Sequence, residues 1–202
     1  MKYLDAFRAL AKLRQDEIVV TSAGNSGQAW WAATRDTEAT FYLDASMSLA
    51  TMFASGLALA RPELKFWAFM GDGAFCMNPG MLMVERQMNL PNLTHILASN
   101  RAYGATSNAA LPNVADNDYP AIARAMGLER VFEFRDLATL EREFAGVAGN
   151  RSGHTFVALE VEPFSDAEQK LEQPPFDGPE LKYRFGRHIE KLTNCEIFGY
   201  RL

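Results

Sequence analysis

Short apolar runs alternate along this chain with segments in which apolar residues recur every three or four positions. Residues 4–13 carry leucine and phenylalanine at helical spacing, so the N-terminal segment is expected to form a helix with one apolar face. Residues 18–20 and 66–70 are continuous apolar runs of the kind found in buried strands. Strands that alternate with helices are typical of parallel sheets. The pattern therefore predicts an α/β fold of three layers, a parallel sheet with helices on both faces.

The same pattern places the remaining elements. Further strands are expected at residues 41–43, 93–99, 131–134 and 155–161, and further helices at 47–60, 79–88, 119–126 and 137–147. The sheet is expected to end near residue 161. Residues 1–164 are thus predicted to form one domain, followed by an extension at 165–202 whose aromatic residues are unusual for a disordered tail.

Composition limits the classes of function. A chain of 202 residues that is 48% hydrophobic and 22% charged is typical of one globular domain. The net charge of −5, without any basic block, argues against nucleic acid as a partner. Cys76 and Cys195 form no CxxC pattern, which excludes a cysteine-bound zinc or iron–sulfur site and favours a reducing compartment. No signal peptide or membrane span is apparent, so we expect a cytoplasmic protein.

Three polar loops, at residues 21–27, 71–75 and 100–104, directly follow predicted strands. Ligands of open parallel sheets bind beyond the carboxyl ends of the strands, so these loops should meet at one edge. Asp72 and Asn100 supply hard oxygen ligands suited to a Mg²⁺ ion that holds a diphosphate. The first loop could present backbone N–H groups to a phosphate. The sequence therefore predicts a cofactor site at this edge.

Gly71-Asp72-Gly73, followed by Asn100 after a second apolar strand, resembles the fingerprint of the thiamine-diphosphate enzymes. Gly-Asp-Gly alone is weak, because Asp-Gly turns are common at strand ends; the paired motif is much stronger. The resemblance implies the cofactors thiamine diphosphate and Mg²⁺. It also implies that the metal is bound by Asp72, Asn100 and the Ala102 carbonyl.

A second correspondence lies upstream of the fingerprint. An isolated methionine usually packs in a core, but the spacing of Met47 to Asp72 resembles that of the bulky residue that bends the cofactor in this family. Met47 is accordingly the implied catalytic wedge, and the Ala45 carbonyl the acceptor for the 4′-amino group. The full set of implied cofactor contacts is Ser22, Gly24, Asn25, Ser26, Ala45, Met47, Gly71, Asp72, Gly73, Ala74, Asn100, Ala102, Tyr103 and Gly104.

The segments around residues 74–78 and 102–105 are similar to the 2-oxo-acid decarboxylase branch, which includes benzoylformate, phosphonopyruvate and sulfopyruvate decarboxylases. The resemblance covers only the diphosphate-binding domain, and a pyrimidine-binding domain would need on the order of 150 further residues. In layout the chain is most similar to split enzymes such as sulfopyruvate decarboxylase. The implied function is a lyase subunit that decarboxylates a 2-oxo acid. Its partner, a pyrimidine-domain subunit of similar size in an α2β2 or larger assembly, would supply a catalytic Glu.

Three alternatives remain open. A related subunit could join two carbonyl compounds or cleave C–C bonds, or the chain could be a non-catalytic assembly subunit, although Asp72 and Asn100 are both intact. A nucleotide-binding protein would need a Gly-x-Gly-x-x-Gly or P-loop motif, and neither is present. The extension at 165–202 is expected to contact the partner or to cover the active site.

Two residues depart from the family pattern, and the three histidines are expected to lie outside the site. Arg101 and Ser48 stand where glycine is common, and Arg101 is interpreted either as an anion-binding group or, more simply, as part of a structural ion pair. His95, His154 and His188 show no ligand spacing, so structural or surface roles are favoured.

Overall fold

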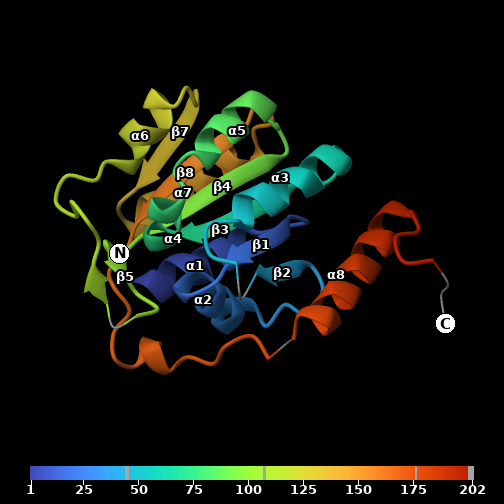
Figure 1. Cartoon of the computed structure of the whole chain (residues 1–202), viewed down its shortest axis with the longest axis horizontal. Coiled ribbons are helices and arrows are strands. Elements are labelled where there is room, and N and C mark those ends of the chain that lie inside the picture. The colour runs from blue at the N-terminus through green and yellow to red at the C-terminus, as the bar shows by residue number, and fades with distance from the viewer. Residues whose placement is uncertain (44–45, 107, 176, 200–202) are drawn as a thin grey trace.

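The computed structural model describes residues 1–43, 46–106, 108–175 and 177–199, and Figure 1 shows its layers. Six strands form one parallel sheet in the order β2-β1-β3-β4-β8-β7. These strands are β1 (Ile18–Ser22), β2 (Thr40–Leu43), β3 (Phe66–Gly71), β4 (Leu93–Ser99), β7 (Arg130–Phe134) and β8 (Thr155–Glu160). The helices are α1 (Tyr3–Leu13), α2 (Asn25–Thr34), α3 (Ala50–Ala60), α4 (Asp72–Met77), α5 (Met81–Met88), α6 (Tyr119–Ala125), α7 (Leu137–Gly149) and α8 (Gly178–Thr193).

Neighbouring residues of each strand belong to two different halves of the apolar core, one on each face of the sheet. Val19 and Phe69 pack with α1, α2 and α7 on one face, whereas Val20 and Met70 pack with α3, α5 and α6 on the other. Successive strand residues point to opposite faces, so a sheet covered on both sides needs continuous apolar strands. The predicted three-layer α/β fold is confirmed.

The chain order creates a crevice between β1 and β3. From β1 the chain moves outward to β2 and then returns to β3 on the other side of β1. The helix after β1 and the helix after β2 consequently cover opposite faces. Such a switch in strand order opens a ligand crevice at the carboxyl ends of the strands. The crevice lies where the sequence predicted the polar loops to meet.

Helix starts differ from the predictions at three places near this crevice. The helix expected from residue 47 begins at Ala50, because Ser48 has a φ of 67°, which a helix cannot contain. The loop expected at 21–27 turns into α2 at Asn25, directly after Gly24 with a φ of 92°. The loop expected at 71–75 is mostly the short helix α4.

Two further features lie outside the main sheet. A short antiparallel hairpin, β5 (Ala102–Tyr103) and β6 (Ala109–Ala110), follows β4. The C-terminal extension contains a 3-10 turn, η1 (Glu168–Lys170), and then α8, whose apolar side packs beside β2. The sequence analysis did not predict α8, although Asp177 caps it by accepting from the Glu180 N–H and a proline lies in its first turn.

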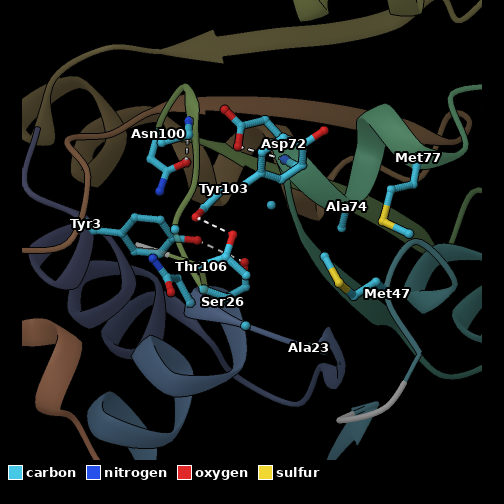
Figure 2. Close-up of a pocket in the computed structure, with 17 residues that line it drawn as sticks. Tyr3, Ala23, Ser26, Met47, Asp72, Ala74, Met77, Asn100, Tyr103 and Thr106 are labelled. Carbon is cyan, nitrogen blue, oxygen red and sulfur yellow. Dashed lines mark hydrogen bonds between the residues drawn. The ribbon is translucent and has the colours of Figure 1, made fainter. Parts of the chain in front are cut away.

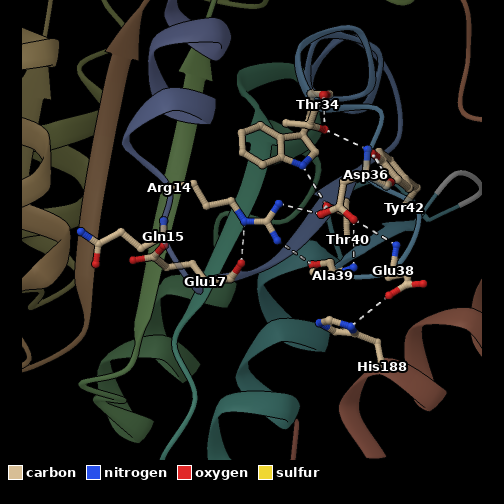
Figure 3. A network of polar contacts seen from close by, with 11 residues as sticks. Arg14, Gln15, Glu17, Thr34, Asp36, Glu38, Ala39, Thr40, Tyr42 and His188 are labelled. Atoms are coloured by element: carbon tan, nitrogen blue, oxygen red, sulfur yellow. Dashed lines mark hydrogen bonds and ion pairs between the residues drawn. The ribbon is translucent and has the colours of Figure 1, made fainter. Parts of the chain in front are cut away.

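A polar network fastens the edge strand β2 to its neighbours (Figure 3). The carboxylate of Asp36 accepts hydrogen bonds from the Arg14 guanidinium at 2.6 Å and from the Thr40 hydroxyl at 2.9 Å. Thr40 in turn accepts from the indole N–H of Trp30 at 2.9 Å. His188 of α8 lies 3.5 Å from the carboxylate of Glu38. The network therefore joins α1, α2 and β2, with α8 in contact beside it.

The described part of the chain lacks two kinds of feature. Among those residues, no helix is both long enough and apolar enough to cross a membrane. Within the same residues, no cluster of three or more His, Cys, Asp or Glu side chains could hold a metal ion.

Candidate cofactor site

A cavity of about 290 Å³ opens at the carboxyl edge of β1, β3 and β4 (Figure 2). Every predicted cofactor contact lines it except Ser22, which is buried in β1, and Ala45, which lies outside the described residues. The sequence analysis did not include Tyr3, Ala23, Met77, Ala105 and Thr106, which also line the cavity. Folding thus brings the three predicted loops together around one space.

Asp72 provides the buried carboxylate of the cavity and is only 1% exposed. Its Oδ2 accepts from the Arg101 backbone N–H at 2.6 Å and from the Ser99 hydroxyl at 3.1 Å, and its Oδ1 accepts from the Gly73 N–H at 2.9 Å. Burial raises the pKa of Asp72 to about 6, although these hydrogen bonds act in the opposite direction. The carboxylate is oriented by neutral donors, and no positively charged side chain bonds to it among the described contacts.

Asn100 and Ala102 bring two more oxygen atoms to the same wall. The side-chain Oδ1 of Asn100 accepts from the Ala102 N–H at 3.2 Å, which fixes the amide with its oxygen toward the loop. The Ala102 carbonyl accepts from the Gly104 N–H at 2.9 Å. Each of these oxygens has two lone pairs and uses one here, so each retains the capacity to coordinate a cation.

The N-terminus of α2 forms the opposite wall and carries unpaired polar groups. Asn25 is 8% exposed, and neither atom of its side-chain amide has a hydrogen-bond partner. The hydroxyls of Ser22 and Thr21 are also buried without partners. Buried polar groups are nearly always hydrogen-bonded. The unpaired amide of Asn25, which lies on the cavity wall at the N-terminus of α2, therefore indicates a site built for a polar, anionic ligand.

Tyr3 reaches this wall from the first helix. Its hydroxyl lies 2.9 Å from Ser26 Oγ, and its ring is almost fully buried. Burial raises the pKa of the Tyr3 hydroxyl well above its usual range, so the group stays neutral. Tyr3 can supply a neutral hydrogen-bonding group, and no local motif of the sequence pointed to it.

Two glycines allow the walls to approach one another. A Cβ at Gly73 would lie 2.8 Å from the ring of Tyr103, and a Cβ at Gly104 would lie 2.2 Å from the side-chain nitrogen of Asn25. Any larger residue at either position would force these neighbours to move. The absence of a side chain at Gly104 therefore allows the loop of residues 100–104 to touch the start of α2.

Two methionines line the other side of the cavity, across from Tyr3 and Ser26 (Figure 2). Met47 is 38% exposed and Met77 is 59% exposed. Met47 lies in a turn before α3, where the left-handed conformation of Ser48 directs the chain. One side of the site is thus apolar and open to solvent, whereas the other is polar and buried.

Comparison with known proteins accounts for this arrangement. Residues 22–161 match the family described as "Thiamine pyrophosphate enzyme, C-terminal TPP binding domain". The chain belongs to this thiamine pyrophosphate enzyme family. The matched region includes every described cavity residue except Tyr3.

Two curated relatives match over nearly their whole length. Sulfopyruvate decarboxylase subunit beta of Methanocaldococcus jannaschii is 29% identical over 191 residues, which are 94% of this chain and 98% of the relative. The protein of the same name from Methanothermobacter thermautotrophicus is 28% identical over 194 residues, 96% of this chain and 98% of the relative. The 2-oxoglutarate synthase subunit KorB of Archaeoglobus fulgidus is 28% identical over 130 residues, 62% of this chain and 45% of the relative.

A solved structure from Mycobacterium smegmatis, described as that of a thiamin diphosphate-dependent enzyme, has a similar fold. The TM-score is 0.67 at 20% sequence identity, and the match covers 81% of this chain. This chain spans about a third of that protein, since 32% of its length is matched. At this identity the likeness shows a shared fold.

The residues of the cavity fit the cofactor of the thiamine pyrophosphate enzyme family. A buried carboxylate without a positive partner, next to an amide oxygen and a backbone carbonyl, is a donor set that Mg²⁺ prefers. The unpaired side-chain amide of Asn25 lines the cavity and provides hydrogen-bonding capacity for a diphosphate. The close approach at Gly104 keeps these two parts of the site together.

Arg101, one of the departures from the family pattern, points away from the cavity. Its guanidinium forms two bonds to the Glu160 carboxylate, at 2.7 and 3.1 Å, and a further bond to the Val114 carbonyl at 2.8 Å. Its backbone has a φ of 58°, the left-handed region that favours glycine. This geometry agrees with the interpretation of Arg101 as part of a structural ion pair. Arg101 reaches Asp72 through its backbone N–H and not through its side chain.

A second buried polar cluster lies away from the cavity and was not apparent in the sequence. The Oε2 atom of Glu85 in α5 lies 3.1 Å from His95 Nδ1 and 2.8 Å from His154 Nε2, and all three side chains are buried. Glu85 is ten residues from His95 and 69 residues from His154, so no short motif could reveal the cluster. Its position agrees with the structural role favoured for His95 and His154.

Proposed function

We propose that this chain is the diphosphate-binding subunit of a heteromeric 2-oxo-acid decarboxylase that depends on thiamine diphosphate and Mg²⁺. The observation that carries the proposal is the match to two sulfopyruvate decarboxylase beta subunits over 98% of each relative. The KorB relative is also named for a 2-oxo acid, 2-oxoglutarate. A 2-oxo acid is therefore the substrate class we assign to the complete enzyme.

The metal would be held by the side chains of Asp72 and Asn100 and the carbonyl of Ala102. Bound Mg²⁺ would neutralise both the diphosphate and the Asp72 carboxylate, which burial leaves without a positive partner. The Ala74 N–H and residues 24–26 at the start of α2 would bind the remaining diphosphate oxygens. These groups would fix the cofactor in place, which is the protein's main contribution to cofactor chemistry.

Met47 would support the bent conformation of the cofactor from the open side of the cavity. When bound, thiamine diphosphate supplies the carbon nucleophile and the electron sink that decarboxylation requires. The Tyr3 hydroxyl, neutral and bonded to Ser26, would complete the buried wall. This chain would therefore bind the cofactor, orient it and shield it. The carboxylic acid that activates the cofactor is assigned to another subunit.

A partner subunit is proposed to supply that acid, a Glu of a pyrimidine-binding domain. Two relatives that match nearly the whole chain are named as beta subunits. Large apolar side chains are also exposed at the mouth of the cavity and on the helices beside it. They are Met47, Leu49, Phe53, Met77 and Met83. Exposed apolar groups of this size are typical of a protein interface, and we assign the interface to the pyrimidine subunit.

The alternatives have less support. A 2-oxoglutarate synthase subunit is suggested by the KorB relative, but the match covers only 45% of that protein. A carboligase would use the same site and would differ in its product. A non-catalytic assembly subunit would have no reason to retain both Asp72 and Asn100 beside unpaired buried polar groups.

The test is to isolate the complex from its source through a tag on this chain, with Mg²⁺ and thiamine diphosphate present. Native mass spectrometry should show a second chain and bound cofactor. The complex should release CO₂ from at least one member of a panel that contains sulfopyruvate, pyruvate and 2-oxoglutarate, and product analysis separates an aldehyde from a carboligation product. A cofactor-free homomer, or no CO₂ from any 2-oxo acid with both subunits present, would contradict the proposal.

A further inference from the structure

The first part of the C-terminal extension runs back along the cofactor site. We call residues 164–172 the strap; they follow the matched region, which ends at residue 161. Figure 1 shows this segment in orange, passing from the neighbourhood of β5 toward α8. Phe164 is buried, and its ring packs edge-on against the ring of Tyr3 at a centroid distance of 4.8 Å. The strap therefore begins in contact with a residue of the cavity wall.

The middle of the strap is bonded to the β5–β6 hairpin. The side-chain amide of Gln169 donates to the Gly104 carbonyl at 3.2 Å and to Asn108 Oδ1 at 3.4 Å. The Asn108 amide returns a bond to the Phe164 carbonyl at 3.3 Å. Gly104 lines the cavity and follows the ligand carbonyl of Ala102 by two residues. Gln169 thus bonds, from outside the cavity, to the end of the loop formed by residues 100–104.

The far end of the strap is bonded to α2, which forms the opposite wall of the cavity. The Gln28 amide donates to the Leu171 carbonyl at 3.2 Å, and Arg35 forms an ion pair with Glu172. One segment of nine residues therefore contacts both walls. Those walls also touch directly, since Gly104 lies against the Asn25 amide.

The hairpin needs such support because it has little of its own. β5 and β6 each contain two residues, and only two residue pairs connect them. A two-stranded ribbon of this length is not stable in isolation. Arg101, just before the hairpin, has a left-handed backbone that an arginine adopts only under strain. Contacts from outside therefore decide how well this loop is held.

We propose that Gln169 is a positioning residue for the metal and diphosphate site. Through the Gly104 carbonyl it holds residues 100–104 against the start of α2, so that the side chain of Asn100 and the carbonyl of Ala102 remain directed into the cavity. The identity of the bound ligand rests on the proposed function. The positioning itself is a property of this chain alone.

Two variants of Gln169 remove the donor, Gln169→Ala and the similarly shaped Gln169→Glu. Gln173→Ala is the matched control, because Gln173 directly follows the strap and is exposed. The first measurement is amide hydrogen exchange of residues 100–106 in the full chain without added cofactor. A hydrogen bond contributes about 0.5–1.5 kcal/mol, so losing the two Gln169 bonds should accelerate exchange about tenfold, while the control exchanges like the wild type.

The second measurement uses the complete complex with its partner. Both Gln169 variants should raise the half-saturating concentration of thiamine diphosphate at fixed Mg²⁺ about tenfold, with kcat at saturation close to the wild-type value. Unchanged exchange at 100–106, or faster exchange that extends equally to α7, would overturn the proposal, since the latter would mean general destabilisation. Failure of the wild-type complex to bind the cofactor would contradict the proposed function, whereas the exchange measurement would still decide the role of Gln169.

Discussion

Two buried carboxylates in this protein, Asp72 and Glu85, differ in how their charge is balanced. Each is 1% exposed. Asp72 bonds to backbone N–H groups and a hydroxyl, and burial raises its pKa to about 6. Burial acts on Glu85 in the same direction, but the interactions with His95 and His154 outweigh it and hold the pKa of that carboxyl well below its usual range.

The surroundings of the two carboxylates differ in the partners that the fold provides. Glu85 has two imidazole partners within the fold, both bonded to its Oε2 atom. Asp72 has only neutral donors, and it lies on the cavity. A buried carboxylate without a compensating charge is costly, and binding a cation removes that cost. A strongly shifted pKa beside a cavity is thus a better sign of a functional site when no charged partner explains the shift than when one does.

The largest expected effect comes from removing the charge of Glu85. Glu85→Gln should lower the free energy of unfolding by about 3–5 kcal/mol, because the charged oxygen that two buried imidazoles share is replaced by a neutral amide group. The pKa of Glu85 is lower in the folded than in the unfolded protein. Its contribution is therefore present above the ordinary value of 4.5 and is lost as the pH falls below it. Urea unfolding between pH 3 and pH 8 should show this loss in the wild type and not in the variant.

The control for this experiment is Glu141→Gln, on the exposed side of α7. If Glu85→Gln and Glu141→Gln destabilise the protein equally, Glu85 is no buried ion-pair centre and the comparison with Asp72 loses its basis.

The second effect concerns the carboxylate on the cavity. Asp72→Asn should weaken Mg²⁺-dependent binding of thiamine diphosphate by at least about 100-fold, since even groups that only orient a metal ligand contribute about 10–100-fold. Without metal the fold should be retained. The pKa of Asp72 is raised on folding, so its stabilising contribution is present below 3.8 and is lost as the pH rises through about 6. At pH 8 the metal-free variant should unfold at the same or a higher temperature than the wild type.

Calorimetric titration of the complex measures the affinity, and thermal unfolding with a chelator measures the stability. Asp116→Asn, an exposed acid in the loop after the hairpin, is the control and should alter neither. Wild-type affinity in Asp72→Asn would show that this carboxylate does not hold the metal.

The smallest effect is expected at Arg101, and it distinguishes a structural ion pair from an anion-binding role of this side chain. Arg101→Gln should cost about 1 kcal/mol of stability, because the pair with Glu160 is partly exposed. The backbone N–H that reaches Asp72 is unchanged in this variant. The KM for the 2-oxo acid should therefore stay within about twofold of the wild-type value, a difference well below 1 kcal/mol.

A double-mutant cycle with Glu160→Gln, followed by urea unfolding, isolates the energy of this pair. A tenfold rise in KM together with no coupling between Arg101 and Glu160 would support the anion-binding alternative considered from the sequence.

Most of the sheet, and the meeting of three polar loops at one edge of it, could be predicted from local patterns, whereas the place of Met47 at the cavity was implied by the family resemblance. The apolar runs ending at Gly71 and Ser99 are continuous because both faces of those strands are covered. Helix starts were less predictable. The positive φ angles of Gly24 and Ser48 determine where α2 and α3 begin, and neither helix has a side-chain hydrogen bond at its N-cap.

The sequence by itself determined the alternation along the chain of the six strands of the main sheet with most of the helices. It also placed Asp72 and Asn100 at the ends of strands, because both features depend on neighbours in the chain. Only the tertiary structure decided that Tyr3 reaches the cavity, that Glu85 bonds to two histidines, and that Gln169 holds the Gly104 carbonyl. The physical reason is chain separation. Tyr3 and Ser26 are 23 residues apart, and Gln169 and Gly104 are 65 apart, so each contact depends on how whole elements pack and not on any local pattern.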